Sequence, residues 1–190
     1  MSSRSTFQQS LRRLKPEKHR QGLAYRDRSQ LQFLSSLKPP FPKLLLDTTV
    51  YIDALQARLP DYTEIALRTA NLWHSTVTEA ELAALAGLLD PAHSHTAKAI
   101  AQLAASIELR PAHRILTPDR DTWREAGILA GLLARLQQYG KNERRKALND
   151  ALIFLSAAKN GCAVLTRNVS DFDLLMQLDE KGQVIFYDSV

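Results

Sequence analysis

The stretch that decides the fold is NDALIFLSAAKNGCAVLTRNVSDFD, residues 149–173. Its apolar run ALIFLSAA predicts a largely buried helix over 149–159, and Asn160-Gly161 supplies residues that commonly end helices. The run CAVLT, 162–166, predicts a buried strand, and DFDLLMQL after it predicts another helix. A helix, a strand and a second helix in this order are typical of a parallel α/β sheet.

The same alternation extends through the rest of the chain. Short apolar runs predict three further strands: KLLLD (43–47), LWHSTV (72–77) and QVIFY (183–187). The segments between them predict helices over 49–57, 61–71, 78–89, 92–107 and 119–139. The charged stretch KNERRK is interpreted as a loop. We therefore expect an α/β fold, a three-layer α/β/α sandwich around a central, mainly parallel sheet.

A basic segment precedes the predicted domain. The prolines of KPPFPK interrupt any helix, so we place a boundary there, between an N-terminal extension, 1–42, and a domain, 43–190. Residues 1–43 contain ten Lys or Arg and two Asp or Glu, a net charge of +8 within a total of +5. This asymmetry favours a polyanionic partner such as nucleic acid; a solvated segment without a partner is the alternative.

The composition excludes several classes of protein. Cys162 is the only cysteine, which excludes an internal disulfide and a cysteine-built zinc site and favours a reducing, cytoplasmic location. No apolar run approaches the roughly 20 residues that span a bilayer, so we expect no membrane partner. Neither GxxxxGK nor GxGxxG is present, which argues against a nucleotide-phosphate cradle.

Four acidic residues follow predicted strands or open predicted helices, where the sites of α/β sheets form. They are Asp47, Glu81, Asp150 and Asp171. Taken singly, helix capping explains the last three: Glu81 in a capping box with Thr78, Asn149 or Asp150 at the start of the buried helix, and Ser170 or Asp171 at the start of the last one. Asp47 ends the apolar run LLL and fits that explanation less well.

Taken together, these carboxylates indicate a metal site. Like charges gathered at one sheet edge cannot all stay ionised without compensation. Oxygen ligands suit Mg²⁺ or Mn²⁺. Such a cation can lower the pKa of a water and stabilise charge on an attacked phosphate.

At this point the chain resembles the PIN-domain family, and in particular VapC-type toxins. LLLDTTVYID resembles the first motif, with its Asp at Asp47 and its Thr at Thr49; STVTEAEL resembles the second, with its glutamate at Glu81 and not Glu79. The stretch 149–173 resembles the remaining motifs, whose acidic positions fall on Asp150 and Asp171, with Thr166 and Asn168 beside them.

The resemblance implies a Mg²⁺- or Mn²⁺-dependent endoribonuclease, the toxin of a type II toxin–antitoxin pair, with a small antitoxin as partner and a homodimer as the usual assembly. Asp47, Glu81 and Asp150 would hold the first ion, and Asp171 would assist directly or through water, with Thr49 and Ser75 in support. Because residue 168 is Asn where some relatives have Asp, one strongly bound ion is expected. Candidates to bind RNA phosphates are Arg144, Arg145, Lys146 and Arg167.

Two other functions remain open. A non-catalytic PIN-like protein would bind RNA or act as a scaffold. A phosphatase with Asp47 as nucleophile would carry a second Asp two residues later, where Thr49 stands. Trp73 and Trp123 lie in predicted helices or strands and are therefore interpreted as packing residues; an aromatic platform that stacks bases would need them exposed.

Overall fold

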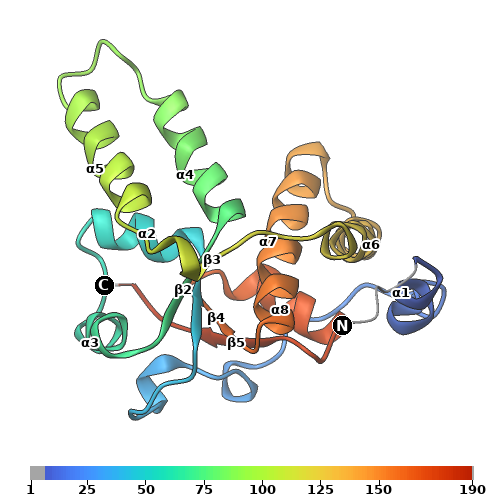
Figure 1. Cartoon of the computed structure of the whole chain (residues 1–190). Helices are drawn as coiled ribbons and strands as arrows, with labels where there is room; N and C mark the ends of the chain where they lie inside the picture. The colour runs from blue at the N-terminus through green and yellow to red at the C-terminus, as the bar shows by residue number, and fades with distance from the viewer. Residues whose placement is uncertain (1–6, 190) are drawn as a thin grey trace.

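The computed structural model describes residues 7–189, and within them the strands form one five-stranded sheet in which all neighbouring pairs are parallel. The strands are β1 (Leu44–Leu46), β2 (Leu72–Ser75), β3 (Ile115–Leu116), β4 (Ala163–Thr166) and β5 (Gln183–Phe186). Their order across the sheet is β3-β2-β1-β4-β5 (Figure 1). The predicted fold class is therefore confirmed.

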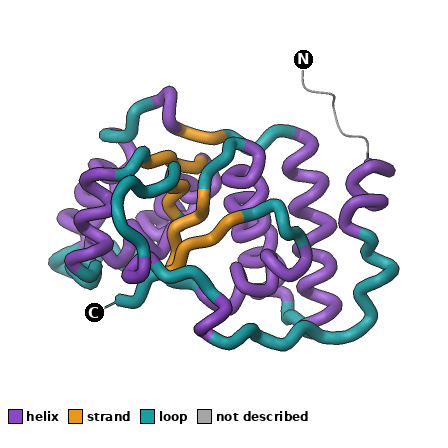
Figure 2. The backbone as a smooth tube through the Cα atoms, turned by 90° about the horizontal axis from the view of Figure 1, so that it is seen from below, coloured by secondary structure: helices purple, strands orange, loops and turns teal. Residues whose placement is uncertain are grey.

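Helices cover both faces of this sheet, as Figure 2 shows from below. They are α1 (Phe7–Leu14), α2 (Thr48–Leu55), α3 (Asp61–Thr69), α4 (Thr76–Leu88), α5 (Thr96–Glu108), α6 (Arg120–Leu136), α7 (Lys141–Lys159) and α8 (Val169–Leu178). Alternate strand residues enter separate cores, since Leu45 packs with side chains of α6, α7 and α8, whereas Leu44 and Leu46 pack with those of α2 and α3. The helices α4 and α5 form a pair that projects beyond the sheet (Figure 1).

Two features of the chain differ from the sequence-based expectation. KNERRK is not a loop but the beginning of α7, which starts at Lys141. Its Lys and Arg residues favour helix, and the side chain of Glu143 accepts a 2.6 Å hydrogen bond from the backbone N–H of Gly140. The edge strand β3 was not predicted, because two residues are too short to show a periodic pattern.

The described part of the N-terminal segment packs on the domain. Leu14 of α1 is buried in the core beside α6. Arg13 forms ion pairs with Glu125 and Asp179, and Arg26 donates to the buried Asp173. The predicted extension, 1–42, includes residues 1–6, which lie outside the described residues. Between residues 7 and 189, no helix combines the length and apolar character that crossing a bilayer requires.

Candidate active site

The predicted carboxylates lie near the point where the order of the strands in the sheet reverses. From β1 the chain adds β2 and β3 on one side, and later β4 and β5 on the other. Asp47 follows β1, and Asn168 follows the adjacent β4. A crevice at the carboxyl ends of two such strands is the usual position of a site in an open α/β sheet.

Asp47 is buried, with 3% of its surface exposed, and is the N-cap of α2. Its Oδ2 accepts hydrogen bonds from the hydroxyls of Thr49 at 2.8 Å and Thr166 at 2.7 Å. Among residues 7–189, no donor bonds to the other oxygen, Oδ1. The threonines therefore orient Asp47 and leave one oxygen for a ligand.

Glu81 lies in the second turn of α4, not in the first as the sequence suggested, because Ser75 caps the helix three residues before the predicted start at Thr78. The capping box of Thr78 with Glu81 is therefore wrong. Instead, the carboxylate of Glu81 accepts hydrogen bonds from the Thr48 hydroxyl and from Nδ2 of Asn149, the latter at 2.8 Å. Burial raises the pKa of Glu81 despite these bonds.

Asp150 accepts the fewest hydrogen bonds of the four carboxylates within the described residues. It lies well inside α7, so the expectation that it caps a helix is also wrong. Only 4% of its surface is exposed, and within the described part of the chain it accepts one long hydrogen bond, 3.4 Å from Nδ2 of Asn168. Burial, followed by the charge of Asp47, raises the pKa of Asp150 well above its ordinary value.

Asp171, in the first turn of α8, has a different environment. It accepts hydrogen bonds from Nζ of Lys146 at 2.6 Å, from Nδ2 of Asn168 at 2.9 Å and from the Tyr139 hydroxyl at 3.1 Å. Burial acts against the ionised form, but the contacts with Lys146 and Asn168 outweigh it and lower the pKa of Asp171. The protein itself therefore supplies the countercharge for this one carboxylate.

One pocket of about 680 Å³ is lined by Asp47, Glu81 and Asp150. Across residues 7–189, none of these three carboxylates forms an ion pair with Lys or Arg, in contrast to Asp171. As the side chains stand, the described residues contain no group of three acidic, His or Cys side chains spaced to coordinate one ion. The donor set nevertheless fits a hard divalent cation, because it consists of carboxylate oxygens that form no ion pair with Lys or Arg among the described residues.

The remaining predicted residues divide into those at this pocket and those away from it. Arg167 and Lys146 line it. Arg145 lines a neighbouring pocket, whereas Arg144 lies outside both and donates to the Tyr139 carbonyl. Ser75 is fully buried, and its hydroxyl caps α4.

The structure adds residues that sequence reasoning missed. Thr48 and Asn149 hold Glu81, and each lies directly beside a predicted acidic residue in the chain. Asp53 is fully buried and accepts a 2.7 Å bond from Nε of Arg167. The sequence feature that could have identified Asp53 is its position in the run YIDAL, one helical turn after Thr49.

The two tryptophans differ. Trp73 is partly buried and packs against the core, as expected. Trp123 is 50% exposed and lines the neighbouring pocket, so its interpretation as a packing residue is wrong. Other residues form the buried face of α6, and the sequence pattern of this long helix did not show that Trp123 lies outside that face.

Comparisons with known proteins agree with this fold. A chain of the crystal structure of VapBC2 from Rickettsia felis bound to a promoter DNA fragment superposes with a TM-score of 0.54 and 16% identity, covering 77% of this chain and 99% of that one. A chain of FitAB bound to the IR36 DNA fragment gives a TM-score of 0.51 and 20% identity, covering 76% and 94%. No curated protein sequence matches significantly. The PIN domain profile matches residues 44–173, and the chain therefore belongs to the PIN-domain family.

Proposed function

We propose that this protein is a Mg²⁺- or Mn²⁺-dependent endoribonuclease that hydrolyses phosphodiester bonds in RNA. The observation that supports this most strongly is the contrast among the carboxylates. Asp47, Glu81 and Asp150 share a pocket, and among the described residues none of them forms an ion pair with Lys or Arg, whereas Asp171 pairs with Lys146. Buried charges are stable when they are paired or bind a metal, and membership of the PIN-domain family is consistent with the second case.

Asp47, Glu81 and Asp150 would hold the ion, and Asp171 would assist directly or through water. When bound, a divalent cation supplies positive charge to an attacked phosphate and lowers the pKa of a water molecule. The chain's own contribution is orientation: Thr49 and Thr166 fix Asp47, and Thr48 and Asn149 fix Glu81. Removing a side chain that orients a metal ligand commonly lowers the affinity for the metal by about 10–100-fold.

Basic side chains at the rim of the pocket would bind the RNA backbone. Arg167 and Lys146 line the pocket, and Asp53 fixes the guanidinium of Arg167 through its Nε. Contacts of this kind give affinity and register without selecting a base.

We further propose that the protein is the toxin of a type II toxin–antitoxin pair, inhibited by a small antitoxin and assembled as a homodimer in the cytoplasm. The support is the likeness of fold to chains of VapBC2 and FitAB, two-component complexes solved on DNA. Copurification of a small protein encoded next to the gene, with inhibition of the nuclease by it, tests this part of the proposal.

The nuclease itself is tested by incubating the protein with RNA in Mg²⁺, in chelator, and with Asp47→Asn in Mg²⁺. We expect cleavage in the first condition only. Cleavage that persists in chelator would contradict the metal-dependent reaction. Unchanged RNA binding without cleavage in any condition would instead favour the non-catalytic alternative, and borohydride trapping of a phospho-aspartate would favour the phosphatase.

A further inference from the structure

A second pocket lies directly beside the carboxylate pocket. It has a volume of about 560 Å³, within the range of roughly 300–1,000 Å³ typical of small-molecule sites. Its walls come from α4 and α7, and its far end from α6 and the loop that follows β3. Glu81 and Lys146 line both pockets, so the two adjoin at the candidate metal site.

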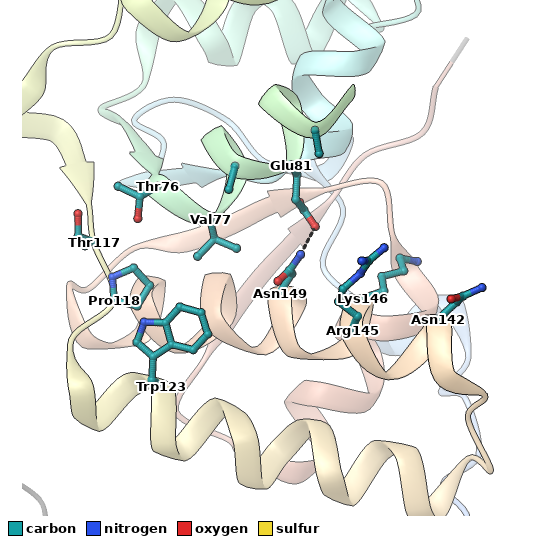
Figure 3. A pocket seen from close by; sticks show the side chains of 12 residues that line it. Thr76, Val77, Glu81, Thr117, Pro118, Trp123, Asn142, Arg145, Lys146 and Asn149 are labelled. Carbon is teal, nitrogen blue, oxygen red and sulfur yellow. Dashed lines mark hydrogen bonds between the residues drawn. The ribbon is translucent and has the colours of Figure 1, made fainter. Parts of the chain in front are cut away.

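One end of this second pocket is aromatic. The indole of Trp123 lies there with Pro118, as Figure 3 shows, and half of the Trp123 surface is exposed. The α4 wall of the pocket includes Val77 beside two small residues, Ala80 and Ala84, and these side chains leave half of the Trp123 surface uncovered. A large aromatic surface is therefore presented to an open space rather than to the core.

The other end is basic and polar. Arg145, Lys146 and Asn142 project from the first turns of α7, and in Figure 3 Glu81 and Asn149 lie between them and Trp123. The Lys146 ammonium bonds to Asp171, whereas Arg145 forms no ion pair among the described residues. The pocket therefore offers an aromatic face and a free guanidinium on either side of the carboxylate Glu81.

We infer that this pocket binds one unpaired nucleotide of the RNA substrate, with its base stacked on Trp123 and its backbone phosphate toward Arg145. The inference rests on the proposed nuclease function. An aromatic ring accepts the face of any base, and the guanidinium matches a phosphate better than it matches a neutral peptide. Because a base must leave a duplex to stack on a protein ring, the pocket selects single-stranded RNA next to the cleaved bond.

Binding of a fluorescently labelled single-stranded RNA, measured by anisotropy in chelator, tests this inference without cleavage. Trp123→Leu removes the ring, and Ala80→Phe fills the pocket from the opposite wall while leaving the ring in place. Leu88→Ala, an exposed apolar change on α4 outside the pocket, is the control. We expect both pocket variants to weaken binding by about 10-fold, and the control to bind as the unmodified protein does.

Two further readouts sharpen the test. The RNA should quench tryptophan fluorescence in the unmodified protein, with little quenching left in Trp123→Leu. The same RNA annealed to its complement should bind the unmodified protein and both variants equally. Unchanged single-strand affinity in Trp123→Leu would overturn the inference, and so would an equal loss for the duplex. If Trp123→Leu instead impaired only the binding of a partner protein, the pocket would be a protein-binding site and the inference would be wrong.

Failure of this inference is distinguishable from failure of the proposed function. Loss of cleavage in Asp47→Asn, combined with unchanged RNA affinity in Trp123→Leu, would reject the nucleotide pocket and leave the nuclease proposal intact. Quenching of Trp123 by single-stranded RNA without cleavage in Mg²⁺ would support the pocket and reject the nuclease.

Discussion

The side-chain amide of Asn149 donates a 2.8 Å hydrogen bond to Oε1 of Glu81 and thereby joins α7 to α4 across the candidate metal site. Glu81 also accepts a bond from the Thr48 hydroxyl at the start of α2. One carboxylate thus connects α4 with α2 and α7. Its position depends on side chains that are not themselves acidic.

Removing the amide should therefore weaken the metal site. Asn149→Leu keeps the approximate shape of the side chain but cannot donate to Glu81, so we expect at least a tenfold loss of Mn²⁺ affinity, of the order seen when ligand-orienting groups are removed. Titration of Mn²⁺ followed by electron paramagnetic resonance measures this directly. Asn142→Leu, at the exposed start of the same helix, is the control. Equal Mn²⁺ affinity in the two variants would show that Asn149 has no positioning role.

Neutralising Asp150 should stabilise the metal-free protein. Burial raises the pKa of Asp150 in the folded state, so between the ordinary carboxyl pKa and that raised value the folded protein keeps a proton that the unfolded chain releases. Stability due to this group is therefore present at low pH and is lost as the pH rises through that window. Asp150→Asn should unfold at a higher temperature than the unmodified protein in chelator at pH 7, and the gain should shrink on acidification.

A matched control for this experiment is Glu108→Gln, which neutralises an exposed carboxylate at the end of α5. We expect its unfolding temperature to stay close to that of the unmodified protein. A lower unfolding temperature for Asp150→Asn in chelator would mean that the ionised carboxylate stabilises the fold, contrary to the environment described above.

The N-terminal segment should contribute to folding through the ion pair of Arg26 with a buried carboxylate. Nε of Arg26 lies 2.5 Å from Oδ1 of Asp173, whose side chain is almost fully buried. Arg26→Met leaves that charge without its partner, at a cost of about 3 kcal/mol in the free energy of unfolding. Arg68→Met, which breaks an exposed pair with Glu64, should cost less than about 1 kcal/mol. Denaturant titration compares the two, and equal losses would contradict a structural role for Arg26.

The sequence predicted the elements whose patterns are local and long. Apolar runs identified β1, β2, β4 and β5, and Asp47 at the carboxyl end of β1 indicated the edge where the pocket lies, because parallel strands bring their carboxyl ends to one edge. Prediction from the sequence failed where the pattern was short or where the structure depends on tertiary contacts. The two residues of β3 have no periodicity, and the helical start of α7 at Lys141 was concealed by its charge.

Side-chain partners were the least predictable part of the candidate site. Thr48 and Asn149 are ordinary polar residues in the sequence, and their contacts with Glu81 arise only when α2, α4 and α7 meet. The exposure of Trp123 was equally unpredictable from the sequence. Its place in a predicted helix suggested packing, but exposure is decided by which neighbours cover a side chain, and half of the Trp123 surface is left uncovered.

The most direct test of the central claim is an anomalous difference map from crystals of the protein soaked in Mn²⁺. We predict a peak in the pocket with oxygens of Asp47, Glu81 and Asp150 at coordination distance, about 2.0–2.3 Å, and no such peak in crystals of Asp150→Asn. A peak elsewhere on the protein, or an empty pocket at saturating Mn²⁺, would contradict the claim.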